Sequence, residues 1–321
     1  MGFPYDRRVG GSPIGRDDVE RAAGVIAGRL HRTPTFSARS LRDDLLLKAE
    51  LFQRTGSFKP RGVLNKLASL TEEERAAGVI SVSAGNHAQA LAWGARGEGI
   101  DAVLVMWRDA DPAKVQATRA YGAEVDLEAV GPADAFRRLD ELRAETGRTF
   151  VHPFDDPLVL AGQGTVGLEI LEDVPEADTI VVPVGGGGLI GGIASACVPG
   201  GVRVVGVEPE GSHALYAGLE AGGSIPVATD SFAQALNAPF AGELSVSICR
   251  ALGVEVVLVS DDEIAEAFRL LYSRAKLACE PGGAAAVAAV LSGKVDGGKT
   301  VCVVSGGNVA GQIAAGILAG P

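Results

Sequence analysis

Residues 181–192 read VVPVGGGGLIGG, and this stretch decides the fold. A short run rich in β-branched residues ends at four consecutive glycines, and an apolar, alanine-rich helical pattern begins directly after them. Glycines lack Cβ, so successive backbone N–H groups can converge, and the following helix adds the positive end of its dipole. The stretch predicts a strand, a loop and a helix, with the loop suited to a phosphate group. The alternative is a tight turn that binds nothing.

The identity of the phosphate ligand stays open at this point. Gly186, Gly188 and Gly191 have the spacing of the dinucleotide fingerprint, and Glu208 ends the next strand-like run about 20 residues further on, where a ribose-binding acid would lie. The Gly-x-x-x-x-Gly-Lys-Ser/Thr pattern of a P-loop is absent. The ligand is therefore either a dinucleotide or another phosphorylated molecule.

Composition limits the partners. The chain has 321 residues, is 47% hydrophobic and carries a net charge of −11, which predicts a globular protein of one large or two modest domains. An acidic chain without a large Lys/Arg cluster is unsuited to nucleic acid or to an acidic membrane surface, so we expect a small-molecule ligand. The four cysteines are widely spaced, as is typical of buried thiols in a reducing compartment.

No targeting or membrane segment is expected. The N-terminal stretch 1–14 lacks the apolar segment of a signal peptide. Residues 179–202 are uncharged, but Pro183 and the glycines interrupt them, which excludes an unbroken lipid-facing helix. These observations predict a cytoplasmic protein.

Apolar strands alternate with helical patterns along most of the chain, which predicts parallel sheets covered on both faces, with ligands at the carboxyl ends of the strands. Clusters near Gly131 and at His152-Pro153 suggest crossings between domains. The expected strands lie near 45–50, 79–82, 102–106, 124–127, 149–151, 181–184, 202–207, 254–259 and 301–304, and the expected helices near 17–30, 60–67, 86–96, 112–121, 132–144, 157–174 and 282–291.

Three further loops fall in the predicted ligand zone, at 54–62, 83–87 and 305–308. Lys59 precedes Pro60 at a predicted helix N-terminus, where the positive dipole end disfavours the ammonium form and prepares a nucleophilic amine. The alternative is an exposed lysine without a role. The loops SAGNH at 83–87 and SGGN at 305–308 could bind a ligand, a carboxylate in the first case, or could simply cap helices.

Taken in order, four motifs resemble those of a known family: GSFKPRG around Lys59, SAGNH at 83–87, the glycine quartet and SGGN at 305–308. The chain is similar to the fold-type II pyridoxal-phosphate enzymes, the tryptophan-synthase β-like group, and among them to threonine/serine dehydratases and serine racemases. The resemblance runs from about 33 to 308 and argues against the dinucleotide, because a dinucleotide enzyme would not need Lys59 or the 83–87 loop.

The resemblance implies a two-domain α/β protein in which each domain is an open, mostly parallel sheet flanked by helices. Residues 1–45 plus 146–321 would form the larger, cofactor-binding domain, and residues 46–145 the smaller domain that closes over the substrate. It also implies a homodimer. The chain ends soon after Asn308, so we expect a single-module, degradative-type enzyme without a C-terminal effector domain.

The resemblance also assigns roles to site residues. Lys59 would be the Schiff-base lysine, and Asn86 would donate a hydrogen bond to the pyridoxal 3′-oxygen. The other cofactor contacts would come from Phe58 beside the ring, Ser305 at the pyridine nitrogen, and Gly185, Gly186, Gly187, Gly188 and Leu189 at the phosphate. The substrate carboxylate would lie among Ser83, Ala84, Gly85, Asn86 and His87.

The implied reaction is β-elimination on L-threonine, L-serine or a related β-hydroxy amino acid, giving a 2-keto acid and ammonia, with Lys59 removing the α-proton. Racemases of the family carry a serine at the position of Ala84, and an alanine cannot transfer a proton, so racemisation is disfavoured. Racemisation or β-replacement on the same scaffold remains the first alternative. A non-catalytic pyridoxal-phosphate-binding protein is the second.

Several positions depart from the family pattern. Glu208 and Ser212 match part of a divalent-cation site, but Ala214 replaces its second acid. Gln234 and Trp107 replace residues usual in the family, which leaves the substrate side chain undefined. Glu280 resembles an acid that lies near the cofactor ring in the family.

Overall fold

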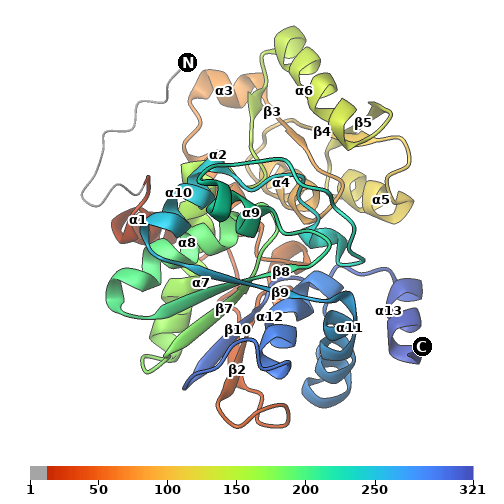
Figure 1. The fold of residues 1–321 in the computed structure, drawn as a ribbon. Helices are drawn as coiled ribbons and strands as arrows, with labels where there is room; N and C mark the ends of the chain where they lie inside the picture. The colour runs from red at the N-terminus through yellow and green to blue at the C-terminus, as the bar shows by residue number, and fades with distance from the viewer. Residues whose placement is uncertain (1–12, 321) are drawn as a thin grey trace.

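The strands form two sheets in the computed structural model, which describes residues 13–320 (Figure 1). The N-terminal stretch that lacks a signal-peptide pattern lies largely outside the described residues. The strands are β1 (Thr35–Ser37), β2 (Leu45–Ala49), β3 (Val79–Val82), β4 (Ala102–Trp107), β5 (Glu124–Ala129), β6 (Thr149–Phe150), β7 (Thr179–Pro183), β8 (Arg203–Pro209), β9 (Glu255–Val259) and β10 (Thr300–Val304).

The larger sheet has the strand order β1-β2-β10-β7-β8-β9, and the smaller has the order β5-β4-β3-β6. All neighbours pair in parallel except β1 and β2, which are antiparallel. The predicted class, two mostly parallel sheets flanked by helices, is confirmed. Figure 1 shows the smaller sheet with α4, α5 and α6 stacked above the larger one.

Helices cover both faces of each sheet. They are α1 (Arg16–Ile26), α2 (Pro60–Ala68), α3 (Glu72–Ala77), α4 (Asn86–Gly97), α5 (Pro112–Ala120), α6 (Pro132–Thr146), α7 (Pro157–Asp173), α8 (Gly188–Cys197), α9 (Ala214–Ala221), α10 (Glu243–Ala251), α11 (Asp261–Leu270), α12 (Pro281–Leu291) and α13 (Gly311–Ala319). Short turns of 3-10 helix, η1 (Glu50–Phe52), η2 (Arg54–Gly56), η3 (Val198–Gly200) and η4 (Gln234–Leu236), and a π-helical turn, η5 (Leu271–Ala275), complete the described elements.

The side chains of β7 divide between two cores, as expected for a strand buried on both faces. Ile180 and Val182 pack in the core formed with α7, α8 and α10. Val181 packs in the opposite core with α11 and α12. The continuous apolar run that predicted this strand thus reflects helices on both sides of it.

Helices α7 and α8 approach each other at backbone distance. A Cβ added to Gly164 would lie 2.6 Å from the carbonyl oxygen of Gly192, and one added to Gly192 would overlap the carbonyl oxygen of Leu160. No residue larger than glycine fits at this crossing without displacing backbone. The contact fixes α8, the helix that follows the glycine quartet, against the rest of the larger sheet layer.

Some local expectations were wrong. The predicted crossing near Gly131 lies between β5 and α6, which both belong to the smaller sheet and its cover. The first helix ends at Ile26 rather than near Leu30, because Gly28 adopts a φ of +72°. The expected domain boundary at 45/46 falls inside β2, and the division into two domains stays a prediction. Within residues 13–320, no helix is both long and apolar enough to cross a membrane.

Candidate functional site

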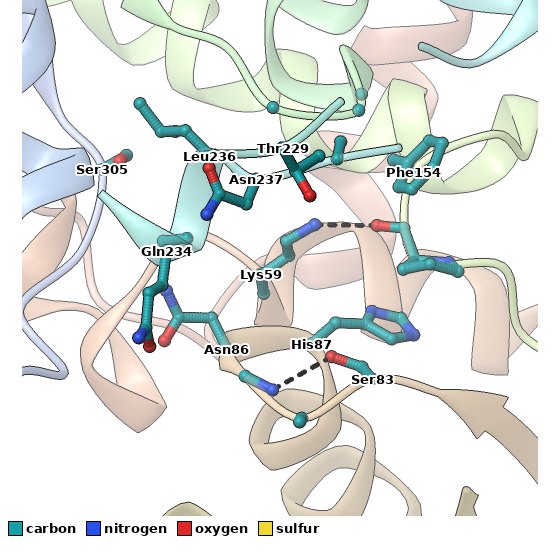
Figure 2. Close-up of a pocket in the computed structure, with 18 of the residues that line it drawn as sticks. Lys59, Ser83, Asn86, His87, Phe154, Thr229, Gln234, Leu236, Asn237 and Ser305 are labelled. Carbon is teal, nitrogen blue, oxygen red and sulfur yellow. Dashed lines mark hydrogen bonds between the residues drawn. The ribbon is translucent and has the colours of Figure 1, made fainter. Parts of the chain in front are cut away.

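The predicted ligand loops meet in one cavity of about 630 Å³. They follow the carboxyl ends of β2, β3, β7 and β10, so parallel strand topology brings together segments far apart in sequence. The cavity is lined by every residue expected to bind the cofactor or substrate: Phe58, Lys59, Ser83, Ala84, Gly85, Asn86, His87, Gly185, Gly186, Gly187, Gly188, Leu189 and Ser305. Figure 2 shows Lys59 in the middle of the labelled side chains.

Lys59 is the residue immediately before α2, as predicted from Pro60. Its Nζ donates a hydrogen bond to the carbonyl oxygen of Pro153 at 2.8 Å and lies 5.1 Å from the centre of the Phe58 ring. Burial lowers the pKa of the Lys59 amine to about 8, and the nearby Glu280 acts in the opposite direction. A substantial fraction of this amine is therefore neutral and nucleophilic near neutral pH.

The glycine quartet fits closely between other segments. A Cβ on Gly186 would overlap the Phe154 ring, and one on Gly185 would lie 3.2 Å from Cα of Leu236. Gly187 has a φ of +90°, which places it in the left-handed region that favours glycine. Only glycines can fill this loop without moving the chain on either side.

The loop also has the donors that a phosphate needs. Among residues 13–320, no protein acceptor receives the N–H of Gly185, Gly186 or Gly187. The N-terminus of α8 begins at Gly188, so its dipole points at the same place. The buried hydroxyl of Ser245, next to Gly187, also has no partner within the described chain. The residues present therefore fit a phosphorylated cofactor.

Asn86 joins two of the loops. Its Nδ2 donates to Oε1 of Glu280 at 2.7 Å, and its Oδ1 accepts a hydrogen bond from Nδ2 of Asn308 at 2.8 Å. An amide nitrogen has two hydrogens, so one donor of Asn86 remains for a ligand. Burial raises the pKa of Glu280 to about 7, while the hydrogen bond from Asn86 lowers it. Glu280 can therefore hold or release a proton near neutral pH beside the cavity.

His87 is held neutral. Burial and the charge of Lys59 lower its pKa well below the ordinary value. Its Nε2 lies 3.0 Å from Oγ of Ser81 and 3.2 Å from the carbonyl oxygen of Val151, and Ser81 itself donates to that carbonyl. Nε2 must therefore carry the proton, because the carbonyl can only accept. A substrate carboxylate at the 83–87 turn would meet N–H groups rather than an imidazolium.

Two predicted residues lie outside the cavity lining. Both carboxylate oxygens of Glu208 accept N–H groups at the start of α9, from Leu215 and Tyr216 at 2.8 Å each. The hydroxyl of Ser212 donates to the carbonyl oxygen of Leu236 at 3.2 Å. The described part of the chain holds no cluster of three or more His, Cys, Asp or Glu able to bind a metal. The cation site stays a prediction.

Sequence reasoning missed one wall of the cavity. Phe136, Phe154 and the 234–239 loop line it, and Lys114 of α5 donates to Oε1 of Gln234 at 3.3 Å across the opening between the two sheets. Among these residues only Gln234 was singled out in the sequence, as a departure from the family pattern, and their convergence depends on how the sheets are placed. The Pro153 carbonyl that receives the Lys59 hydrogen bond is a backbone group, so no side-chain pattern could identify it.

Comparisons with known proteins agree with this geometry. The profile of the family described as "Pyridoxal-phosphate dependent enzyme" matches residues 26–307. The chain is 42% identical to the catabolic L-threonine dehydratase of Escherichia coli (strain K12), over 92% of this chain and 94% of that protein. It is 41% identical to the L-threonine ammonia-lyase of Thermotoga maritima, over 91% of this chain and 75% of that protein.

Solved structures give a similar result. The T.th. threonine deaminase matches with a TM-score of 0.87 and 39% identity, covering 92% of this chain and 99% of that one. Maize serine racemase matches with a TM-score of 0.89 and 35% identity, covering 93% of this chain and 95% of that one. The overall fold is thus shared with structures named for two different activities.

Proposed function

Because the chain belongs to the pyridoxal-phosphate-dependent enzymes, we propose that it converts L-threonine, L-serine or a related β-hydroxy amino acid into a 2-keto acid and ammonia. The family match confirms the resemblance seen in the four motifs, together with the cofactor and the lyase class expected from it. The observation that carries the proposal is the single cavity that unites the Lys59 amine, the glycine loop and the 83–87 turn.

The cavity can hold the cofactor with groups already described. The free N–H groups of Gly185 to Gly187 and the start of α8 would bind its phosphate. Phe58 would lie beside its ring, Ser305 would meet its ring nitrogen, and Asn86 would donate its remaining amide hydrogen. When bound, pyridoxal phosphate supplies a ring that withdraws electrons from the α-carbon of an attached amino acid.

Lys59 would then act as nucleophile and base. Its lowered pKa of about 8 leaves a useful fraction of Nζ unprotonated near neutral pH, which suits both covalent attachment of the cofactor and removal of the substrate α-proton. The Pro153 carbonyl, 2.8 Å away, holds Nζ in place and can accept a hydrogen bond from the amine in either protonation state.

The 83–87 turn would orient the substrate. The N-terminus of α4 begins at Asn86, and N–H groups at a helix start bind carboxylates well. Neutral His87 adds no positive charge, so the carboxylate would be held mainly by backbone donors and by the hydroxyl of Ser83. Anchoring the carboxylate here and the amino group at Lys59 would fix which α-carbon bond faces Nζ.

Racemisation is the second candidate, because maize serine racemase is among the structures similar to this chain. Racemisation needs a proton donor on the face of the α-carbon opposite Lys59. The family's racemases have a serine at position 84, whereas Ala84 lines this cavity and has no transferable proton. This residue favours elimination over racemisation.

Assembly and location extend the proposal. We expect a homodimer, as in the resembled family, and a cytoplasmic location. All four cysteines are unpaired and buried, which supports a reducing compartment. Light scattering after size-exclusion chromatography tests the dimer, and a mass of one chain at micromolar concentration would exclude it.

The decisive experiment measures ammonia and keto acid formed from L-threonine, L-serine, 3-hydroxyaspartate and phenylserine. Keto acid from L-threonine or L-serine is the expected result. D-serine from L-serine without keto acid would favour racemisation, a new β-substituted amino acid formed with an added nucleophile would favour β-replacement, and a spectral change without turnover would indicate a binding protein.

The Lys59→Ala variant tests the central residue. We expect it to fold, to lose the visible absorbance of the covalently bound cofactor, and to release no ammonia. Lys66→Ala is the matched control, because Lys66 lies on the same helix α2 but pairs with Asp156 at 2.8 Å outside the cavity lining. Unchanged absorbance in Lys59→Ala would remove Lys59 from its role.

A further inference from the structure

A buried network of charged side chains lies directly beneath the first turn of α2, outside the cavity lining. It joins Lys48 of β2, Glu50 of η1, Arg61 of α2 and Glu169 of α7. Lys48 and Glu50 are completely buried, and Arg61 is 1% exposed. Charged side chains are almost never this deeply buried unless they are paired.

The Arg61 guanidinium satisfies all of its donors. Nε and Nη2 donate to the two oxygens of Glu50 at 2.8 Å each, and Nη1 and Nη2 donate to the two oxygens of Glu169 at 2.7 and 2.9 Å. Nη1 also donates to Oγ1 of Thr165 at 3.1 Å. Two bidentate carboxylates and one hydroxyl thus account for the five N–H groups of an arginine. Because the guanidinium is planar, these paired hydrogen bonds fix its orientation as well as its distance from the two carboxylates.

Both cations of the network are paired with carboxylates. Lys48 donates to the carbonyl oxygen of Thr33 at 2.8 Å and pairs with Glu169 at 2.7 Å and with Asp173 at 3.5 Å, so each cation meets two carboxylates. Burial alone would lower the pKa of Arg61, but Glu50 and Glu169 raise it above its ordinary value, so the guanidinium stays charged. A buried ion cluster of this kind adds little net stability compared with apolar residues of the same volume. The contribution of the cluster is therefore expected in the geometry that it imposes on the surrounding segments rather than in stability.

That geometry acts on the segment that carries Lys59. Arg61 is two residues beyond Lys59, and its N–H donates to the carbonyl oxygen of Phe58 at 3.1 Å, which closes the turn around Lys59. The next residue, Gly62, donates its N–H to Oε1 of Gln163 of α7 at 3.2 Å. The first turn of α2 is therefore tied to α7 by a guanidinium and by backbone, while the Lys59 side chain extends into the cavity from the same turn.

We propose that Arg61 is a positioning residue for Lys59: its contacts with Glu50 and Glu169 fix the first turn of α2, and thereby hold the Lys59 amine at the Pro153 carbonyl where it can reach the substrate. The inference rests on the role of Lys59 in the proposed function. It predicts that weakening the guanidinium contacts displaces the amine although no residue that lines the cavity is substituted.

The test uses Arg61→Lys, which keeps the charge but cannot bind two carboxylates bidentately. We expect kcat for L-threonine to fall roughly a hundredfold, the effect expected of a misplacement of about 1 Å, while KM stays near the wild-type value. In the cofactor-free protein, competitive reductive methylation with mass spectrometry follows the titration of the Lys59 amine. Its midpoint should move from about 8 toward the ordinary 10.5 as the amine leaves its buried position.

Two further variants keep the test decisive. Glu169→Gln removes one carboxylate, should shift kcat and the Lys59 titration in the same direction by less, and serves if Arg61→Lys does not fold. Arg138→Lys is the matched control, because Arg138 binds Asp126 at 2.9 Å in the smaller-sheet region and makes no contact with α2. If Arg61→Lys lowers the thermal midpoint but leaves kcat and the Lys59 titration unchanged, Arg61 has only a structural role. If Lys59→Ala retains its cofactor absorbance, the proposed function fails instead, so the two failures are distinguishable.

Discussion

Burial controls the protonation of the key single residues in this protein. It lowers the pKa of Lys59 and raises the pKa of Glu280 and Glu208, in each case by disfavouring the charged form. For Lys59 and Glu280 the result is a pair of groups in one cavity whose pKa values both lie near neutral pH. For Glu208, outside the cavity lining, the result is a pH-dependent contribution to stability.

Glu208 makes that dependence testable. Burial raises its pKa from 4.5 to about 8, although the two N–H groups that it accepts act in the opposite direction. Between these pH values the folded protein retains a proton that the unfolded chain releases, so the free energy of unfolding falls as pH rises from about 4.5 to about 8. Glu208→Gln cannot titrate, so its free energy of unfolding should vary less with pH in this window.

Urea denaturation at pH 5 and pH 8 measures the effect. At pH 5 the glutamine variant should be less stable by about 1 kcal/mol, because the amide accepts only one of the two N–H groups. At pH 8 this difference should shrink or reverse. Exposed Glu210→Gln is the control. If the free energy of unfolding varies with pH in the same way in wild type and Glu208→Gln, the raised pKa of Glu208 is contradicted. If Mg²⁺ shifts the thermal midpoint of wild type but not of Glu208→Gln, the cation site is supported instead.

Short sequence motifs predicted some of the individual residues that line the cavity. Lys59 stands before a proline at a helix start, and the 83–87 turn follows an apolar strand, so both positions were predictable from local pattern. The Arg61 network was not, because a charged residue in a sequence is normally expected to face water. The separation of Glu50, Arg61 and Glu169 along the chain gives no sign that folding brings them together.

At the scale of structural elements, the turn from β7 to α8 depends on glycines for two separate reasons. Gly187 needs glycine for its φ of +90° and also for space, since an added Cβ would lie 2.6 Å from Cβ of Ser245. Gly201 has nearly the same φ, +88°, but nothing lies within 4 Å of an added Cβ. Substitutions at Gly201 and Gly187 can therefore distinguish the cost of a left-handed backbone from the cost of steric crowding.

We therefore expect Gly201→Ala to lower the free energy of unfolding by about 1 to 2 kcal/mol, the cost of a left-handed backbone, with unchanged affinity for pyridoxal phosphate. Gly187→Ala should lower stability further and weaken cofactor binding, because the loop must move away from Ser245. Urea unfolding of the cofactor-free protein and titration with pyridoxal phosphate measure the two effects. Equal affinities in both variants would show that the loop does not need its observed shape.

Element types were predictable where a local signal is strong, such as Asp156-Pro157 at the start of α7 and the continuous apolar run of β7. The antiparallel strand β1 was missed, because Thr35–Ser37 is only three residues long and carries no alternation that a sequence pattern could reveal. It is stabilised by pairing with β2, a contact made after the chain reverses through residues 38–44. Tertiary pairing, rather than local preference, defines such a strand.

At the scale of the whole molecule, the reactivity of the four cysteines measures global unfolding. Cys197, Cys249 and Cys279 are buried, and burial raises the pKa of each thiol to about 12, while Cys302 shifts in the same direction. Thiolates are the reactive form, so the folded protein should react very slowly with a thiol reagent at pH 8. We expect four reactive thiols to appear only on unfolding, at the midpoint seen by circular dichroism. Rapid labelling of any cysteine in the native protein would indicate local opening.

Strand and helix alternation predicted parallel sheets, and the family resemblance predicted two of them, but their mutual placement did not follow from the sequence. Lys114 contacts Gln234, and Phe240 packs against both Phe136 and Phe154, so segments associated with the two sheets meet beside the cavity. Such contacts depend on long-range packing angles, which no local pattern encodes. Sequence therefore left undefined the part of the cavity that we expect to face the substrate side chain.

The glycine crossing of α7 and α8 has a consequence for how this scaffold can diversify. Backbone touches backbone there, so neither helix can accept even one extra methyl group at Gly164 or Gly192, and the position of α8 behind the glycine loop is fixed. We expect changes in substrate preference to arise instead in the segment from Trp107 to Lys114 and the loop from Gln234 to Pro239, which line the cavity without glycines. The crossing would then keep the phosphate-binding end constant, while these two segments set the selectivity.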